Sequence, residues 1–124
     1  MATPVKLTAF AAVFTVSDVA AAHRFYLDKL GFRSEFTLGE PMQYAIIERD
    51  NVQLHLMPAT RAPETLGRSS IYVFAAGVDA LHEELKGRGC AIEVPPQDFD
   101  YGMRETSVRD PDGNRITFGE EVKK

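Results

Sequence analysis

The first third of the chain alternates between apolar runs and a segment of helical spacing. Residues 8–16 (TAFAAVFTV) are mostly apolar and predict a buried strand. The next segment, residues 17–31, repeats apolar side chains three or four positions apart, at Val19, Ala22, Tyr26 and Leu30. A Ser-Asp pair that can cap a helix precedes them, and a glycine that suits the left-handed position after a helix follows them. We therefore predict a strand followed by a helix.

Three further strands are predicted to complete a βαβββ unit. Residues 32–38, 42–49 and 51–58 combine β-branched and aromatic residues with near alternation of apolar and polar positions. The pair Asp50-Asn51 predicts a tight hairpin turn between the last two strands.

The same order of elements returns in the second half of the chain. Residues 69–75 predict a strand, and residues 77–89 predict a helix with an apolar face. Three strands are predicted after this helix, at residues 90–94, 104–110 and 114–120. The prolines and polar residues of segment 95–103 (PPQDFDYGM) predict a loop, and DPDG predicts a turn.

The two halves can be superposed by residue number. The helix starts match at a shift of 59 residues, and the hairpin turns match at a shift of 62. Agreement in element order, turns and helix starts indicates a duplication. We predict an α+β fold in one domain, residues 1–124, made of two βαβββ modules at about residues 5–58 and 68–120.

Composition narrows the classes of partner. The formal net charge of −4 and a pI near 5.3 offer no basic surface for nucleic acid or acidic lipid. The apolar run near the N-terminus is too short to span a bilayer. The single cysteine, Cys90, permits neither an internal disulfide nor a cysteine-based zinc cluster. We expect a cytoplasmic protein with no nucleic-acid or membrane partner.

Two stretches resemble the ends of a vicinal-oxygen-chelate protein, a superfamily that includes glyoxalases, bleomycin resistance proteins and extradiol dioxygenases. They are FTVSDVAAAHRFYLDKLGFRSEF and YGMRETSVRDPDGNRITFGEE. The resemblance covers nearly the whole chain and is strongest to the small bleomycin-resistance-type proteins. It implies that each module forms a curved sheet, that two modules together make a groove, and that helices cover the outer face. It also implies a homodimer that binds a small-molecule ligand in a cleft between subunits.

Strand alternation assigns side chains to the helix side or the groove side of each sheet. In residues 52–57 the aliphatic side chains share one face, which should pack against a helix, so the other face should line the groove. The same rule directs Phe10, Phe14 and Val16 to the helix side, and Ala11, Val13 and Thr15 to the groove.

Aromatic residues on the strands and loop that border the groove offer large contact areas for planar ligands. Alternatively, some of them fill the sheet interior or the dimer contact. The candidate ligand-binding residues are Tyr44, Gln53, His55, Met57, Ser70, Tyr72, Phe74, Tyr101, Arg115 and Thr117.

Metal-dependent members of the superfamily take His, Glu or Gln ligands from four strand positions. By resemblance, these positions are Ala11, His55, Ser70 and Thr117 in this chain. Only His55 is a usual ligand, whereas tight binding needs three or four protein donors. We expect no metal and no cofactor. His55 then lines the groove as a hydrogen-bonding group, or it is a strand residue without a role.

Two acidic stretches have both structural and functional interpretations. DPDGN lacks the further ligands of a calcium loop, and we interpret it as a turn. Arg104, Glu105 and Arg109 predict ion pairs at an exposed edge. Glu105 could also act as a general base, although no partner is visible in the sequence.

The resemblance favours a metal-free protein that sequesters an antibiotic or a similar planar or cationic compound. The chain has no tryptophan, on which antibiotic-binding relatives commonly stack their drug, and YGMRE is one residue longer than their WGRE-like form. Bleomycin is therefore one candidate among several. The alternatives are a glyoxalase-like lyase or isomerase, or a dioxygenase-related enzyme, with an unusual site around His55 and Glu105. A ligand-sensing subunit is a third, and it would need a partner domain.

Overall fold

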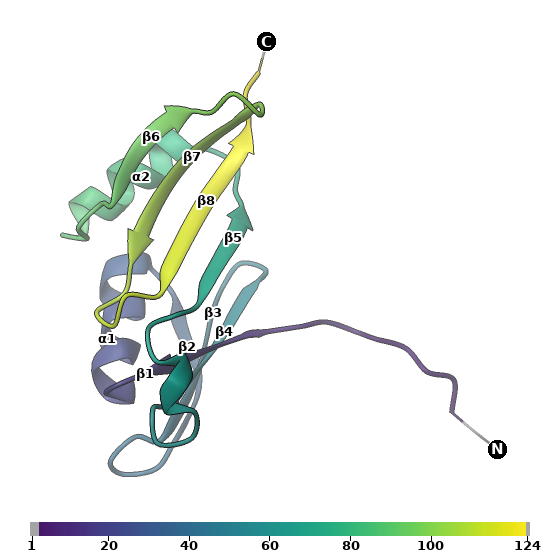
Figure 1. Cartoon of the computed structure of the whole chain (residues 1–124), viewed down its shortest axis with the longest axis vertical. Helices are drawn as coiled ribbons and strands as arrows, with labels where there is room; N and C mark the ends of the chain where they lie inside the picture. The colour runs from purple at the N-terminus through teal and green to yellow at the C-terminus, as the bar shows by residue number, and fades with distance from the viewer. Residues whose placement is uncertain (1–2, 124) are drawn as a thin grey trace.

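The computed structural model describes residues 3–123, which form two consecutive βαβββ units (Figure 1). The first unit comprises β1 (Ala12–Val16), α1 (Val19–Leu30), β2 (Arg33–Leu38), β3 (Tyr44–Arg49) and β4 (Val52–Pro58). A short 3-10 turn, η1 (Pro63–Thr65), leads to the second. That unit comprises β5 (Ser70–Phe74), α2 (Val78–Gly87), β6 (Val94–Asp98), β7 (Met103–Arg109) and β8 (Arg115–Glu121). The predicted α+β fold is confirmed.

Each unit forms its own four-stranded mixed sheet. The strand orders are β1-β4-β3-β2 and β5-β8-β7-β6, with the first strand of each unit parallel to the last. Val13 lies opposite His55 in the first sheet, and Tyr72 lies opposite Thr117 in the second. These two pairs correspond at the shifts of 59 and 62 found in the sequence, so the duplication extends to the register of the strands.

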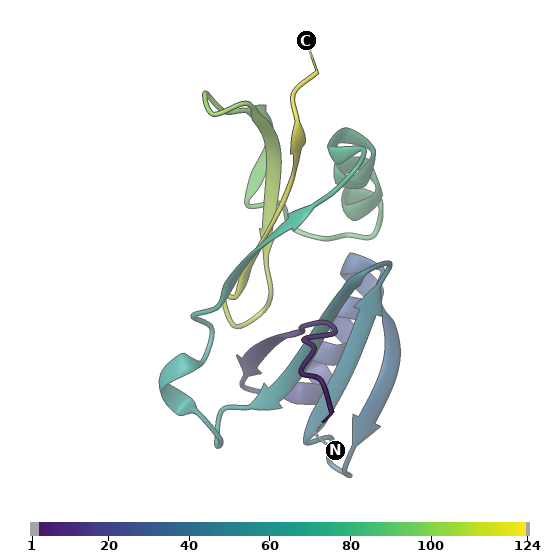
Figure 2. The same cartoon turned by 90° about the vertical axis from the view of Figure 1, so that its right-hand side faces the viewer.

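Both helices lie on one side of the molecule (Figure 1), and the view turned by 90° shows the first sheet in front of α1 and the second sheet beside α2 (Figure 2). Helix α1 is capped at its start by Asp18, whose Oδ1 accepts a hydrogen bond of 3.0 Å from the Ala21 amide, and at its end by Gly31 with φ of 72°. The four apolar residues at helical spacing are all buried, as predicted: Val19, Ala22, Tyr26 and Leu30. No helix within residues 3–123 is long and apolar enough to span a bilayer.

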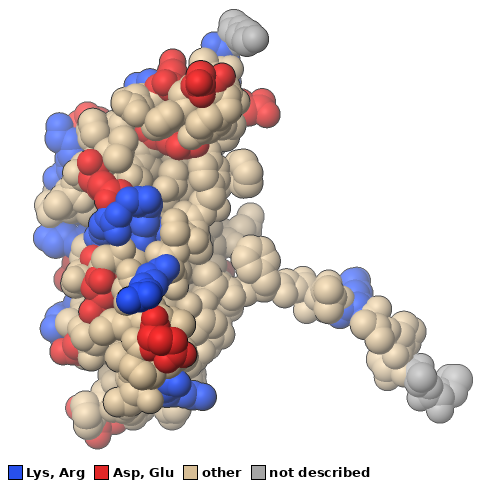
Figure 3. Space-filling view, in the orientation of Figure 1, with Lys and Arg blue, Asp and Glu red and all other residues tan. Residues whose placement is uncertain are grey.

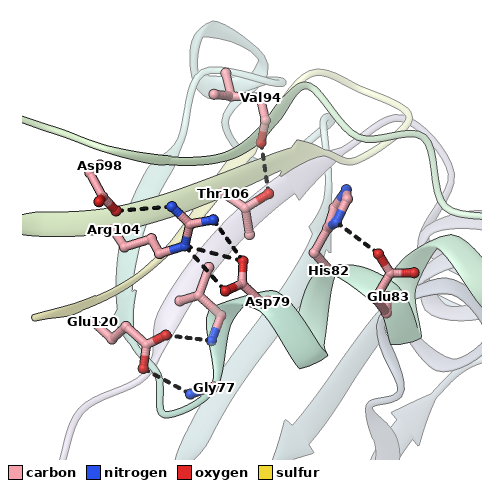
Figure 4. Close-up of polar contacts among 10 residues, drawn as sticks. Gly77, Asp79, His82, Glu83, Val94, Asp98, Arg104, Thr106 and Glu120 are labelled. Atoms are coloured by element: carbon pink, nitrogen blue, oxygen red, sulfur yellow. Dashed lines mark hydrogen bonds and ion pairs between the residues drawn. The ribbon is translucent and has the colours of Figure 1, made fainter. Parts of the chain in front are cut away.

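The start of α2 is held by its own sheet (Figure 4). Gly77, the residue before the helix, has no side chain to cap it, and the Glu120 carboxylate on β8 accepts from the amides of Gly77 and Val78 at 2.9 and 2.8 Å. These backbone donors hold the pKa of Glu120 below its usual range. Arg104 on β7 adds an ion pair of 2.9 Å to Asp79 in the first turn. The helix is thereby fixed to the outer face of the second sheet.

The predictions for residues 90–103 are wrong in part. Residues 90–94 were expected to form a strand and residues 95–103 a loop, but β6 spans Val94–Asp98 and contains Pro95 and Pro96. Residues 99–102 form a loop between β6 and β7, as predicted. Strand β6 is an edge strand that pairs only with β7, and its register shifts between Val94 and Gln97. Prolines are tolerated there because the irregular pairing does not need their missing amide hydrogens.

Two side chains near β1 also differ from the prediction. The strand begins only at Ala12, so Phe10 does not reach the helix side; it is 92% exposed on an extended segment, residues 3–11. We call this segment the N-terminal arm. Thr15 is buried rather than open to the groove, because η1 covers it and the Thr65 hydroxyl bonds to its own.

A buried polar network joins the two units. The Tyr26 hydroxyl on α1 donates to Asp110 Oδ2 at 3.0 Å, and the Asn114 amide donates to the same oxygen at 2.8 Å. Asn114 also donates to the Thr15 carbonyl and accepts from the Ser69 amide. Burial, reinforced by the Asp110 charge, raises the pKa of Tyr26 well above its usual range. The DPDG segment is a turn, as predicted, but its first residue, Asp110, and the residue after it, Asn114, also anchor the first unit to the second.

An ion pair makes a second connection between the units. Arg49 on β3 contacts both oxygens of Glu84 on α2, at 2.9 and 2.8 Å, and Arg88 contacts Glu84 at 2.8 Å. Arg49 also donates to the Leu30 carbonyl at the end of α1. The hydrogen bonds from Arg49 and then Arg88 lower the pKa of Glu84 to about 2.

We expect Tyr26→Phe to lower the free energy of unfolding by about 1.5–3 kcal/mol, the range for a hydrogen bond to a charged group. Ser34→Ala is the control, because it also removes a hydroxyl, but one that is exposed and bonds to His23 rather than to a buried carboxylate. The control should change stability by about 0.5 kcal/mol or less. Urea unfolding of both variants provides the comparison, and equal losses would contradict the anchoring role of Tyr26.

We also expect Glu84→Gln to flatten the dependence of stability on pH between about pH 5 and pH 2. An unfolded glutamate has a pKa of about 4.3, so the lowered folded value stabilises the protein above that pH, and this contribution is lost as the pH falls toward 2. The pair is partly exposed, which limits its contribution at neutral pH to about 1 kcal/mol.

Melting temperatures measured across this pH range check the Glu84 prediction. Glu64→Gln is the control, since Glu64 is exposed and forms no ion pair within residues 3–123. A Glu84→Gln curve parallel to that of the unmodified protein would refute the proposed contribution of this pair.

Candidate functional site

One face of each sheet is free of helices, and we call these two surfaces together the open face. On the first sheet, the open face carries Val13, Phe36 and Leu38. In the strand register these three residues lie opposite His55, Ile46 and Tyr44, respectively, which share the same face. On the second sheet the open face carries Tyr72 and Phe74 from β5 and Glu105 from β7. Charged side chains in the space-filling view gather mainly over the side that bears the helices, whereas the N-terminal arm is almost uncharged (Figure 3).

Large hydrophobic side chains are exposed on this face and on the arm. Every large hydrophobic residue that is more than a third exposed belongs to the arm, to the open face or to the loop beside it: Val5, Leu7, Phe10, Val13, Phe36, Leu38, Tyr72, Phe74 and Tyr101. Alternation had assigned Tyr72 and Phe74 to this side. It had not identified Phe36 and Leu38, because β2 was left without a face assignment.

His55 is held from both sides by neutral neighbours. Gln53 donates its amide hydrogen to Glu48 at 3.3 Å, which directs its oxygen to His55 Nε2 at 3.1 Å. Nε2 therefore donates, and Nδ1 accepts from the Tyr44 hydroxyl at 2.9 Å. The Tyr44 and His55 rings also meet edge to face, with centroids 5.6 Å apart. Both ring nitrogens are used, so the predicted hydrogen-bonding character of His55 is satisfied within its own sheet.

Glu105 is the centre of the open face on the second sheet. Its side chain is buried, with 8% exposure, and its two oxygens accept from the Tyr72 hydroxyl at 2.7 Å and the Tyr101 hydroxyl at 2.8 Å. The sequence had suggested ion pairing at an exposed edge or a general base without a partner. The structure gives Glu105 two tyrosine partners, which come from a strand 33 positions away and a loop four positions away.

Gly119 makes the contact between Tyr72 and Glu105 possible. Glu105 lies opposite Gly119 in the β7–β8 ladder, and Tyr72 reaches across β8 to bond with it. A Cβ atom on residue 119 would overlap the Tyr72 hydroxyl. Burial, followed by the hydrogen bond and the charge of Glu105, raises the pKa of Tyr72 to about 12. The hydroxyl thus stays protonated and donates at neutral pH.

An open hollow of about 440 Å³ lies above this group. It is lined by Tyr72, Phe74, Tyr101, Met103, Glu105 and Thr117. Four of these residues were among the predicted ligand-binding residues, namely Tyr72, Phe74, Tyr101 and Thr117. The structure brings these four together and adds Met103 and Glu105, which sequence reasoning had not placed there. The YGMRE segment carried the signal, since Tyr101, Met103 and Glu105 alternate along it.

The other predicted site residues lie elsewhere. Tyr44, Gln53, His55 and Met57 belong to the first sheet. Arg115 on the second sheet is engaged by Glu93, whose Oε1 accepts from its Nε at 2.8 Å. Hydrogen bonds from Arg109 and Arg115 help to lower the pKa of Glu93 to about 2, with Arg109 the larger cause. Ser70 begins β5, beside Arg115 in the parallel ladder.

The four superfamily metal positions carry few metal-binding side chains in this chain. Ala11 precedes β1, and Ser70, Thr117 and His55 lie on three different strands. Of the four, only His55 is a common ligand, and Tyr44 and Gln53 occupy both of its nitrogens. Within residues 3–123, no group of three or more His, Cys, Asp or Glu side chains is placed to hold a metal ion. The donor set therefore does not fit the ion of the metal-dependent enzymes.

Comparison with known proteins identifies the family. The family model described as "Glyoxalase/Bleomycin resistance protein/Dioxygenase superfamily" matches residues 8–118. This chain belongs to that superfamily. A comparison with curated protein sequences found no match.

Solved structures of the superfamily share this fold over nearly the whole chain. The bleomycin-binding protein of Streptomyces verticillus, solved with copper(II)-bleomycin, is 28% identical with a TM-score of 0.77, covering 97% of this chain and 100% of its own. TioX from Micromonospora sp. ML1 is 20% identical with a TM-score of 0.78, covering 93% and 99%. Lactoylglutathione lyase from Agrobacterium tumefaciens is 21% identical with a TM-score of 0.75, covering 94% and 95%. The last two show the fold alone, and a shared fold does not by itself establish a shared function.

Proposed function

We propose that this superfamily member is a metal-independent binding protein that sequesters a planar small molecule, such as an antibiotic. The observation that carries the proposal is the hollow on the second sheet, where aromatic rings surround hydrogen-bonding groups. Such a surface suits a planar ligand with a few polar atoms. Sequestration makes and breaks no bond, so it requires affinity and shape but no reactive group. The likeness to a bleomycin-binding protein supports this class of ligand.

The ligand cleft is proposed to lie between two copies of the chain. Apolar side chains extend over the open faces of both sheets, and the arm adds Val5, Leu7 and Phe10. Monomeric proteins seldom leave so much apolar surface exposed. A second copy is the occupant that fits best, because the arm and the faces it would cover are apolar alike.

The enzyme hypothesis has less support. It required His55 and Glu105 to act in one unusual site, yet they lie on different sheets and no hydrogen bond joins them within residues 3–123. His55 is engaged by Tyr44 and Gln53, and Glu105 by two tyrosines. The single cysteine, Cys90, is buried, and burial raises the pKa of its thiol, which disfavours the reactive thiolate. An unpaired cysteine also fits a reducing compartment such as the cytoplasm.

We expect the purified chain to be a dimer, with twice the 13.8 kDa mass of one chain. Light scattering coupled to size exclusion at micromolar concentration measures this mass. Placing a charge in the proposed contact, by Phe36→Glu together with Phe10→Glu, should shift the mass toward that of a monomer. Lys86→Glu, on the exposed part of α2, is the control and should leave the mass unchanged. A monomeric unmodified protein would refute the shared cleft.

We expect chelator-treated protein to bind a member of a panel of planar compounds that includes metal-free bleomycin. Tyr72→Ala should weaken that binding by about 1–3 kcal/mol, the range for a lost aromatic contact and its buried area. Phe25→Leu, on the helix side, should leave affinity unchanged.

Titration calorimetry gives the affinities, and elemental analysis gives the metal content. About one tightly held ion per chain, together with loss of binding when it is removed, would overturn metal independence. Unchanged affinity in folded Tyr72→Ala would show that the hollow is not the binding site.

A further inference from the structure

Glu105 is a buried carboxylate without a cationic partner. It forms no ion pair within residues 3–123, and both of its oxygens bond to neutral hydroxyls. Two other carboxylates of the open face are paired: Glu48 with Arg33, and Glu93 with Arg109 and Arg115. Buried charges in proteins are normally paired, because removing a carboxylate from water is costly. Glu105 therefore offers an uncompensated negative charge at the base of the hollow.

The tyrosines hold this charge in place without neutralising it. A carboxylate has about four acceptor positions, and the hydroxyls of Tyr72 and Tyr101 occupy one on each oxygen. The remaining positions are available to a donor in the hollow. The glycine at position 119 lets Tyr72 reach Glu105 from the far side of β8.

Aromatic rings surround the charge. The Tyr72 and Phe74 rings are tilted by 59° with centroids 5.2 Å apart, and Tyr101 stacks on Phe99 beside them. Phe74 is 81% exposed, so its ring face is available for contact. The faces of aromatic rings attract cations, and a carboxylate at the same site adds a full negative charge. Together these groups match an organic cation with an apolar surface better than they match a neutral or anionic compound.

The corresponding place in the first sheet lacks this charge. When the two sheets are superposed, the Thr106–Phe118 pair matches the Ala45–Leu56 pair. The residues that come just before Thr106 and Ala45 are Glu105 and Tyr44, so these two occupy equivalent positions. Tyr44 is neutral and its hydroxyl bonds to His55. A ligand that spans both surfaces would therefore meet a charged half and a neutral half.

We propose that the hollow is a cation site, in which Glu105 receives the ammonium, amidinium or N-alkylated aromatic cation of the ligand while Phe74 and Tyr101 contact its apolar surface. The proposal rests on the proposed function and specifies the charge of the ligand and the residue that recognises it. Because the hollow opens on the apolar face, the rest of the ligand can lie along that face.

The test uses two probes of equal shape that differ only in charge, phenyltrimethylammonium and its neutral isostere tert-butylbenzene. Binding to the full chain is followed by nuclear magnetic resonance titration at pH 7.5. We expect the cation to bind at least tenfold more tightly than the neutral probe. Glu105→Gln, which keeps the shape and an acceptor oxygen, should weaken cation binding tenfold or more and change neutral binding by about threefold or less.

Two further variants separate charge recognition from a general effect on the fold. Phe74→Leu removes an exposed ring face but keeps an apolar side chain, so it should weaken the cation several-fold more than the neutral probe. Glu48→Gln removes a negative charge from the open face of the first sheet and should leave both affinities within about threefold.

Each outcome decides between the two proposals. Equal affinity for the two probes, or cation binding that Glu105→Gln leaves intact, overturns the cation site while sequestration of planar compounds stands. Failure of both probes and of the whole planar panel to bind at millimolar concentration overturns the proposed function and the cation site together.

Discussion

The contact between Tyr26 and Asp110 is the constraint on which the arrangement of the two units depends. Each unit has its own sheet and helix, and the chain between them is a loop, residues 59–69, that contains η1. The buried Tyr26 hydroxyl on α1 donates to the Asp110 carboxylate at the β7–β8 turn. Asn114 donates to the same carboxylate and also bonds to the backbone of β1 and of the residue before β5. Polar groups at such depth tolerate few geometries, because a displaced partner would deprive a buried charge of one of its donors. The network therefore fixes how the two open faces lie relative to each other.

Most of the fold could be predicted from local sequence because its signals are local. Three of these signals, the cap at Asp18, the glycine after α1 and the alternation in β4, each depend on a few neighbouring residues. The duplication added a second line of support, because an element predicted in one half was expected at the matching position of the other. Strand β6 was missed because its two prolines oppose the usual strand signal. Only its position at the edge, with an irregular register to β7, makes them acceptable. That position is a property of the sheet and not of the segment.

The candidate site was predicted only in part, for a related reason. Alternation placed Tyr72, Phe74 and Thr117 on the correct face because a period of two needs no knowledge of neighbours. The burial of Glu105 depends instead on Tyr72, on another strand, and on the absence of a side chain at Gly119 between them. His55 is a candidate whose role depends on neighbours that its local sequence does not reveal. It is an isolated histidine in a strand, and in the structure Tyr44 and Gln53 form hydrogen bonds to both of its ring nitrogens within the sheet.

Gly119 gives this protein a simple route to altered selectivity. The residue lies within β8, and the atoms nearest to the position of a Cβ there are the hydroxyl and ring carbons of Tyr72. Any larger residue there would turn the tyrosine away and open the carboxylate to water, while the helix side of β8 would keep its packing. A single substitution at Gly119 would therefore change the ligand preference of a relative without requiring a second substitution in the core.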